Sequence, residues 1–238
     1  MSNDPILATT LQVLGQFHSK SVFLYGSRGR GDFKPDSDYE LGIIFDDDKY
    51  VRRANIHAVI TNPDIKAYPF KWGELSSGTL DILFQKSIYL REIIEGAKTI
   101  AGEDIIGQIQ PPPITTLDLV QDIRFYIGRA LDALLSYRSG DIETSMDAFS
   151  KSCFFGLRAL EILKLKKFPV GYDTIYNLSA ELVKDPEYRE PIEAAYAVRK
   201  EGKKPEIDTL YQNISLLDSF IEPKILAAFK DGGDRQLI

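Results

Sequence analysis

Three consecutive prolines, at positions 111 to 113, separate two halves of the chain that have different hydrophobic periods. Proline cannot continue a helix or a central strand, so three in a row form a stiff, extended connector. Before it, apolar runs such as Val22–Tyr25 and Leu41–Phe45 are typical of strands. After it, apolar residues recur every three or four positions, as on one side of a helix. We therefore predict two domains, residues 1–110 and 114–238.

Both halves show the periodicity of several elements. In the first, we predict a leading helix over Pro5–His18, a helix over 50–62, an edge strand over Lys66–Trp72 and a helix over Ile88–Ile100. In the second, one apolar stripe includes Val120, Ile123, Ile127, Ala130, Leu131 and Leu134, and another includes Phe149, Cys153, Gly156, Leu157, Leu160 and Leu163. The short link Arg138–Asp141 favours an antiparallel pair. Further helices are predicted over 175–183, 188–199 and 210–229, the last interrupted at Pro223.

A glycine-rich segment, Gly26-Ser27-Arg28-Gly29-Arg30-Gly31, directly follows the first apolar run. Glycine allows positive φ and a close backbone approach, so several N–H groups can converge on one anion. Ser27 adds a hydroxyl donor, and the arginines add positive charge. Such a segment is more often an ordinary solvated loop when it stands alone, but its composition is that of a phosphate-binding turn.

Three acids accompany this segment. Asp38 and Glu40 lie two positions apart at the start of the second apolar run, so alternation along a strand would place both carboxylates on one face. Two such charges raise each other's pKa unless a cation lies between them, and a divalent ion with oxygen ligands meets that need. Asp81 lies within the apolar run 79–85, where it needs a cation or backbone N–H donors. The combination favours a magnesium site. The acidic run 46–48 is better explained as a solvated turn.

These motifs occur in the order Gly-Ser-x-Gly-Arg, Ser-Asp-x-Glu with a hydrophobic strand, and Leu-Asp-Ile-Leu, and they resemble the polymerase-beta-type nucleotidyltransferase superfamily. The Asp-x-Glu pair is similar to the small bacterial branch that includes kanamycin nucleotidyltransferase. The resemblance covers about residues 20–90. It implies an α+β nucleotidyltransferase domain, a mixed sheet flanked by helices, followed by an all-α helical bundle. Carried over by position, the triphosphate-binding residues would be Gly26, Ser27 and Arg30 with Ser37 supporting the loop, and the metal carboxylates would be Asp38, Glu40 and Asp81.

The resemblance also implies a metal-dependent, adenylyltransferase-like reaction. An acceptor hydroxyl would attack the α-phosphate of ATP or another nucleoside triphosphate, with two Mg²⁺ ions stabilising the attacking and leaving oxygens. The kanamycin enzyme has a helical-domain Glu as base and a Lys one turn later. Matching the Tyr-x-Gly step places Phe125 and Arg129 at those positions, which puts kanamycin in doubt as the acceptor. Asp122, one turn earlier and on the side away from the apolar stripe, is the candidate base; the alternative is a surface charge.

The helical half resembles the HEPN-type domains that accompany small nucleotidyltransferases. Some of these domains are metal-independent ribonucleases that use an Arg and a nearby His. The histidines of this chain, His18 and His57, both lie in the first half, so the second half lacks that acid/base. Binding the acceptor is the role left for the helices.

Composition excludes several other classes. A formal net charge of −6 argues against general nucleic-acid binding, which requires a basic face. The single cysteine, Cys153, excludes an intrachain disulfide and a cysteine-based zinc cluster. No apolar run approaches the length of a membrane span and no signal peptide opens the chain, so we expect a cytoplasmic protein with no membrane partner.

Two functions remain open. The first is nucleotidyl transfer to a small hydroxylated acceptor such as an aminoglycoside, which the net negative charge would attract weakly. The second is a nucleotide-binding, antitoxin-like or regulatory module that acts on a protein partner. A deep acid-lined cleft would favour the first, and an exposed basic or apolar surface on the helices would favour the second. Related enzymes that build a site from two chains make a homodimer an option.

Overall fold

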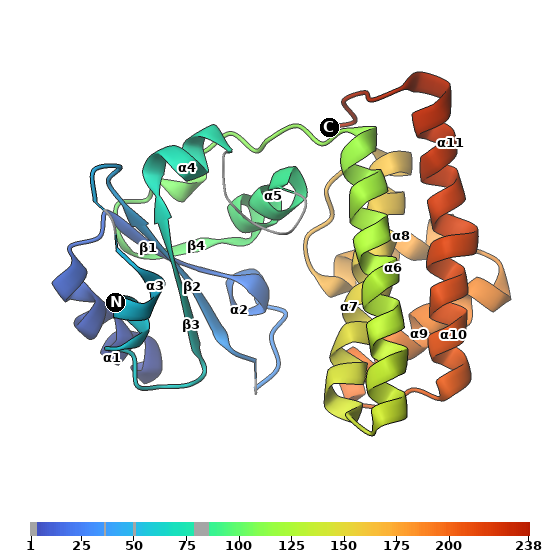
Figure 1. Ribbon diagram of the computed structural model, residues 1–238, viewed down its shortest axis with the longest axis horizontal. Coiled ribbons are helices and arrows are strands. Elements are labelled where there is room, and N and C mark those ends of the chain that lie inside the picture. Colours follow the sequence, from blue (N-terminus) through green and yellow to red (C-terminus); the bar gives the residue numbers. More distant parts are fainter. Residues whose placement is uncertain (1–3, 36, 50, 79–85) are drawn as a thin grey trace. The chain divides into compact units, whose positions relative to one another are not determined.

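The computed structural model describes residues 4–35, 37–49, 51–78 and 86–238 (Figure 1). The chain divides into two compact units, Met1–Pro112 and Pro113–Ile238. The first contains a sheet with flanking helices, and the second contains helices, which confirms the predicted fold class. Within the described residues, no helix combines the length and the apolar character that a membrane crossing needs.

The first unit is built on a mixed sheet. Its described strands are β1 (Ser21–Tyr25), β2 (Tyr39–Phe45), β3 (Ile65–Lys71) and β4 (Lys98–Gly102), in the order β3-β2-β1-β4. β1 is antiparallel to β2 and β4, whereas β2 is parallel to β3. The predicted edge strand is confirmed as β3. The prediction of one helix over Ile88–Ile100 is partly wrong, because α5 (Lys86–Gly96) ends at Gly96 and the chain then pairs with β1 as β4.

Helices cover both faces of this sheet. One face packs against α1 (Pro5–Leu14) and α3 (Arg53–His57), and the other packs against α4 (Trp72–Ser77) and α5. The first core includes Leu7, Leu14, Leu41, Ile43, Ile56 and Ile65, and the second includes Phe23, Ile44, Phe70, Leu75, Leu90 and Ile93. Alternation along β2 divides its side chains between the two cores. The leading helix is confirmed, but the helix predicted over 50–62 is limited to the five residues of α3.

Short elements complete the first unit. A 3-10 helix, η1 (Gly15–Phe17), extends α1, and another, η2 (Ile106–Gln108), follows β4. The acidic run 46–48 forms the predicted exposed turn after β2. Lys20 forms an ion pair with Asp46 at 3.4 Å, and the Gly73 N–H donates a hydrogen bond to Asp47 at 2.6 Å.

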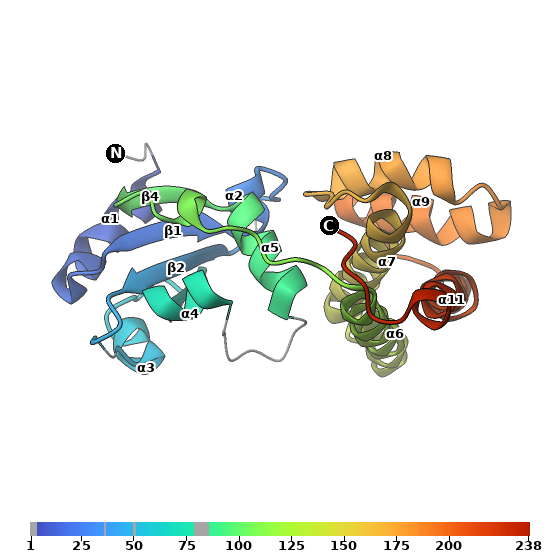
Figure 2. The same cartoon turned by 90° about the horizontal axis from the view of Figure 1, so that it is seen from above.

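The second unit is helical throughout its regular parts. Its elements are α6 (Thr116–Ser139), α7 (Ile142–Leu165), α8 (Tyr172–Leu182), α9 (Pro186–Glu201), α10 (Ile207–Ser215), the π-helical η3 (Leu216–Ile221) and α11 (Glu222–Gly232). Figure 2 shows α6 beside α7, with α11 on another side of α6. Pro223 lies in the first turn of α11, directly after the π-helical turn of η3.

α6 and α7 form the predicted pair, joined by a tight turn at Gly140, whose φ is +86°. The Ser145 hydroxyl on α7 donates a hydrogen bond to the Ala133 carbonyl on α6 at 2.8 Å. Gly156 lets η3 pack closely on α7, because a Cβ there would lie 2.3 Å from Cδ2 of Leu217. The final residues pair with the start of α6: the N–H of Ile114 donates to the Ile238 carbonyl at 3.0 Å.

Candidate active site

The glycine-rich segment forms a short helix, α2 (Gly26–Arg30), directly after β1. This corrects the prediction of an open turn with three permissive glycines. Gly26 and Gly31 do have positive φ, +65° and +87°. Gly29 is helical, and it is required for a different reason: its Cβ would lie 2.6 Å from the Gly96 carbonyl oxygen. The segment is therefore packed against α5 through Gly29 and turns sharply at its two ends.

The two acids of the motif lie at the start of β2. Asp38 is exposed and directly precedes the strand, whereas Glu40 is half-buried within it. Glu40 pairs in register with Tyr25, the last residue of β1. A Cβ on Gly26 would lie 1.7 Å from Oε2 of Glu40, so the carboxylate occupies space that only glycine leaves open. The sheet thus brings one predicted metal ligand against the first residue of the predicted phosphate-binding segment.

Tyrosine side chains surround the Glu40 carboxylate. Tyr25 and Tyr89 hydrogen-bond to each other through their hydroxyls, and the Tyr68 ring contacts the Tyr25 ring edge-on at 6.3 Å. Burial, reinforced by Tyr89 and Glu40, raises the pKa of Tyr25 far above its ordinary value. Burial also raises the pKa of Tyr89 to about 12. Both phenols are therefore protonated at neutral pH, and the Tyr25 hydroxyl donates its hydrogen to the Tyr89 hydroxyl. The sequence analysis did not assign them a role.

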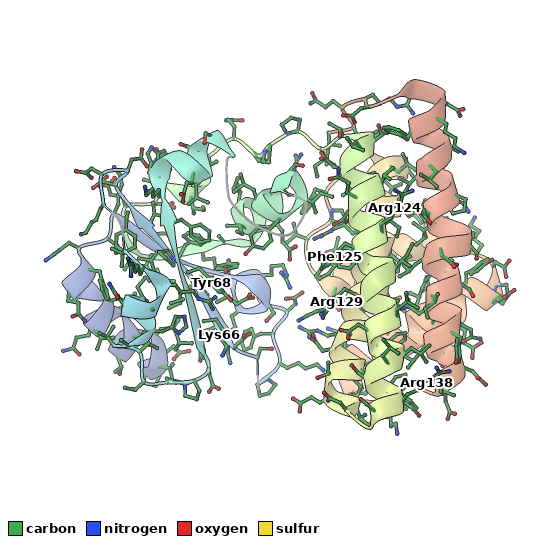
Figure 3. The ribbon with its side chains drawn as sticks, viewed as in Figure 1. Lys66, Tyr68, Arg124, Phe125, Arg129 and Arg138 are labelled. Atoms are coloured by element: carbon green, nitrogen blue, oxygen red, sulfur yellow. The ribbon has the colours of Figure 1, made fainter. Side chains whose placement is uncertain are left out.

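Lys66 also lies beside Glu40, because the two residues are register partners in the parallel pairing of β2 and β3. Figure 3 labels Lys66 and Tyr68 on β3. The Lys66 ammonium donates a hydrogen bond to the Pro63 carbonyl at 2.9 Å. This part of the sheet therefore presents a carboxylate, phenol groups and one ammonium group.

Arg28 organises the loop between α2 and β2. Its guanidinium donates hydrogen bonds to the Ser37 carbonyl at 2.8 Å and to the Pro35 carbonyl at 3.2 Å. It also stacks over the rings of Tyr39 and Phe33, 3.8 and 4.7 Å from their centroids. Arg28 could not be distinguished from the other basic residues before the fold was known, because its partners are main-chain carbonyls. Their position depends on how the loop folds.

Ser37 and Arg30 are held by neighbouring residues. The Ser37 hydroxyl accepts a hydrogen bond from the Lys34 N–H at 2.9 Å, which stabilises the loop that leads to Asp38. Arg30 forms ion pairs with Asp32 at 3.3 Å and with Glu92 of α5 at 2.9 Å, and its side chain is only 7% exposed. Arg30 therefore anchors α2 to α5. Ser27 is half-buried in the first turn of α2.

The third predicted metal ligand, Asp81, lies outside the described residues, as does the strand predicted over 79–85. In the part of the chain that the structure describes, no group of three His, Cys, Asp or Glu side chains is placed to hold a metal ion. Of the three predicted ligands, Asp38 and Glu40 lie within the described residues.

The residues predicted for the acceptor side lie on α6. Asp122 is 5% exposed, so the alternative of a surface charge is wrong. Phe125 is 39% exposed, and its ring meets Tyr126 edge-on at 5.1 Å.

Arg129 lies one turn after Phe125 and forms longer ion pairs, 3.7 Å to Asp132 and 3.6 Å to Asp147 of α7. Asp147 also forms an ion pair with Lys151, one turn later on α7, at 2.9 Å. The structure therefore gathers a set of mixed charges around Arg129, next to the exposed ring of Phe125.

Comparison with known proteins agrees with this arrangement. Residues 7–101 match the family described as nucleotidyltransferase domain. No curated protein gives a significant match. Similar solved structures include spectinomycin adenyltransferase AAD(9) from Enterococcus faecialis, crystallised with ATP and spectinomycin. The TM-score is 0.59 at 14% identity, over 93% of this chain and 98% of that chain, so the two chains share a fold. The predicted resemblance to polymerase-beta-type nucleotidyltransferases is confirmed.

Proposed function

We propose that the nucleotidyltransferase domain transfers a nucleoside monophosphate from ATP to the hydroxyl group of a small molecule, with Mg²⁺. The observation that carries the proposal is the position of the Glu40 carboxylate against Gly26. Transfer from a magnesium-bound triphosphate requires donors for phosphate oxygens beside carboxylates for the metal. The junction of β1, α2 and β2 supplies both kinds of group within a few ångströms.

The donor set fits magnesium. Asp38 and Glu40 offer hard carboxylate oxygens, and we propose Asp81 as the third ligand. The metal would neutralise charge on the reacting phosphate and on the leaving pyrophosphate. The chain's own residues would do the positioning. Tyr25 and Tyr89, both protonated, would keep the Glu40 carboxylate in place, and the missing Cβ of Gly26 would let it lie close to the phosphate donors.

We propose Gly26, Ser27 and Ser37 as the triphosphate-binding residues. Ser27 offers a hydroxyl at the start of α2, and Ser37 holds the loop through Lys34. Arg30 would contribute positive charge while it keeps α2 against α5, since its guanidinium already contacts two carboxylates. Arg28 would act indirectly, by fixing the loop that ends at Asp38.

The acceptor would be bound by the helical unit, whose HEPN-like character remains a prediction. The similar spectinomycin adenyltransferase was crystallised with ATP and spectinomycin, which supports a small-molecule acceptor. At the two α6 positions matched to the kanamycin enzyme's Glu and Lys, this chain has the exposed aromatic ring of Phe125 and the guanidinium of Arg129. Arg129 forms ion pairs with two aspartates. We keep Asp122 as the proposed base, although its burial means that a proton must reach it through neighbouring groups.

Calorimetric titration with ATP tests the donor site. We expect binding that depends on Mg²⁺ in the wild-type protein and is lost in Asp38→Asn and Glu40→Gln. Asp48→Asn is the matched control, because Asp48 is an exposed acid in the turn after β2 and outside the proposed site. Unchanged Mg²⁺-dependent binding in both site variants would refute the metal assignment.

Transfer of label from α-³²P-ATP tests the reaction itself. The acceptor panel should contain aminoglycosides, spectinomycin-like aminocyclitols, other hydroxyl compounds and a cell lysate. Label on a small molecule, absent in Glu40→Gln, supports the proposal. Label on a protein would instead support the antitoxin-like or regulatory alternative, and binding without any transfer would refute the enzyme assignment.

A further inference from the structure

Four basic side chains lie at one end of the helical unit. They come from the last turn of α7, the residue that caps α7, the first turn of α11 and the segment after α11. We call this set the basic cluster: Lys164, Lys166, Lys224 and Arg235. The segment after α11 runs back to the start of α6, which lies beside the end of the antiparallel α7 (Figure 1). There the main chain of Arg235 forms two hydrogen bonds with Thr116, at 3.0 and 3.1 Å.

The charges of the basic cluster are close enough to repel one another. Partial burial lowers the pKa of the Lys166 ammonium, and the charges of Arg235 and Lys164 lower it further. Partial burial and the Lys164 charge lower the pKa of the Lys224 ammonium in the same way. Among the residues that the structure describes, no carboxylate forms an ion pair with any of these four side chains. A bound anion would relieve this repulsion.

Three acids on the same elements have other surroundings. Asp234 accepts a hydrogen bond from an N–H group in the first turn of α6, at 3.0 Å. Glu222 forms an ion pair with Arg124 of α6, at 3.0 Å. Burial raises the pKa of Glu161, one turn before Lys164, to about 9, so this carboxyl is protonated at neutral pH. None of these three carboxyl groups is paired with the basic cluster.

The backbone of Lys166 is left-handed, with a φ of +56°. Four other helices also end in a left-handed residue, and each of them has glycine there: Gly31, Gly78, Gly140 and Gly202. Glycine adopts this conformation without the steric cost that a side chain adds. The backbone at the end of α7 therefore does not favour a lysine, and an outlier of this kind indicates that its side chain has a function.

Two other groups of the basic cluster are held in place. The Lys224 ammonium donates a hydrogen bond to the Phe220 carbonyl of η3 at 2.7 Å, and it lies 3.3 Å from the centroid of the Phe220 ring. The Arg235 guanidinium lies against Gly232, where a Cβ would be 2.9 Å from Nη1. Its N–H groups donate to no residue in the described part of the chain, so they are open to a ligand. Groups positioned in advance lose less freedom when a ligand binds.

We propose that the basic cluster binds a compact polyphosphate group, inorganic or part of a nucleotide, without a metal ion. Adjacent phosphates carry several negative charges within a few ångströms, which matches ammonium and guanidinium groups gathered at one end of the helices. An acidic protein surface spreads its carboxylates more widely and would require cations along a whole face. The site goes beyond the proposed donor site, which requires Mg²⁺ and lies in the other unit.

Calorimetric titration of the full chain with sodium tripolyphosphate in EDTA tests the site, because EDTA removes the Mg²⁺ that the donor site requires. We expect binding that Lys166→Gly weakens by about tenfold or more. Lys203→Gly is the matched control, because Lys203 is an exposed lysine after α9 that pairs with Glu201 at 3.4 Å. No binding to the wild-type protein, or binding that Lys166→Gly leaves unchanged, overturns the proposal.

Thermal unfolding of the same proteins separates binding from folding. Glycine suits the left-handed backbone at position 166 and removes one of the repelling charges, so Lys166→Gly should melt at a temperature no lower than the wild type does. Tripolyphosphate should raise the melting temperature of the wild type more than that of the variant, because it binds the folded chain. Lys224→Met, which keeps an apolar contact with Phe220, should behave like Lys166→Gly. Equal rises in all three proteins would overturn the proposal.

Titrations in EDTA with other anions identify the source of the phosphates. Equal affinities for ATP and tripolyphosphate would show that the phosphates alone are recognised, and a higher affinity for ATP would show that the nucleoside contributes; both results support the site. Poly-glutamate that binds more tightly than tripolyphosphate would overturn it in favour of an acidic protein segment. Lys166→Gly should keep the Mg²⁺-dependent binding of ATP at the donor site, so the two proposals can fail separately.

Discussion

Replacing Gly26 with alanine perturbs both the backbone and the carboxylate at the candidate site. The φ of Gly26 is +65°, where alanine costs about 1–2 kcal/mol. The added Cβ would also lie 1.7 Å from Oε2 and 2.8 Å from Cδ of Glu40. The carboxylate must therefore rotate away, since the Gly26 backbone is fixed by β1 and α2. We expect Gly26→Ala to lose the Mg²⁺-dependent binding of ATP in addition to about 1–2 kcal/mol of stability.

Gly31→Ala is the matched control for this prediction. The φ of Gly31 is +87°, so alanine carries a similar backbone cost, but its Cβ would meet nothing within 4 Å. Urea unfolding should show comparable losses in the free energy of unfolding for the backbone part of both variants, and calorimetry should show ATP binding retained only in Gly31→Ala. Equal ATP affinity in the two variants would refute the argument that the missing Cβ of Gly26 positions Glu40.

Three further substitutions should change the stability of the protein in ways that the surroundings of each residue predict. Arg28→Ala should lower the free energy of unfolding by about 1–3 kcal/mol, because two carbonyls of the loop 33–38 lose a charged donor; urea unfolding measures this, and Arg28→Lys should not restore it. Burial raises the pKa of the Glu161 carboxyl from 4.5 to about 9, so this carboxyl takes up a proton on folding. The contribution of Glu161 to the free energy of unfolding should be full below about pH 4.5 and should be lost as the pH rises toward about 9, by about 1.4 kcal/mol per pH unit. Glu161→Gln should flatten this decline, whereas the exposed Glu201→Gln should leave the pH profile of unfolding unchanged. Gly128→Ala should raise the free energy of unfolding by about 0.5–1 kcal/mol, because a Cβ there would meet nothing within 4 Å; urea unfolding measures this, and a loss of stability would contradict it.

The sheet unit was largely predictable because its signals are local. Val22–Tyr25 and Leu41–Phe45 are apolar throughout and appear as neighbouring strands β1 and β2. β4 was missed because Lys98–Gly102 follows a helical pattern without a proline and becomes a strand only by pairing with β1. The position of the glycine-rich segment after β1 was predicted correctly, but its helical conformation was not. Glycine is needed at position 29 because a Cβ there would clash with the Gly96 carbonyl oxygen, and not because the backbone has a positive φ.

The acceptor side was less predictable because its residues are defined by contacts between distant helices. Asp122 looks exposed on a helical wheel that considers α6 alone, yet it is buried in the folded chain. The ion-pair partners of Arg129 include Asp147, which lies on α7, and no local spacing in the sequence links these two residues. A single sequence gives the period of each helix but not which faces meet, so the burial of a polar residue between two helices escapes it.

This difference has a consequence for how such a protein changes its substrate. The proposed donor site is built from residues 26 to 40, on two adjacent strands whose register fixes Glu40 against Gly26. The α6 side chains can change without disturbing that register: a different residue at position 125 would alter the surface that the helical unit is proposed to offer to an acceptor and would leave β1 and β2 untouched. A fold shared at 14% identity is compatible with this division, because the sheet and helices persist while individual side chains differ. Nucleotide binding and acceptor choice should therefore respond to separate substitutions: Glu40→Gln should abolish transfer to every acceptor, and Phe125→Glu should change which acceptors are labelled while ATP affinity stays the same.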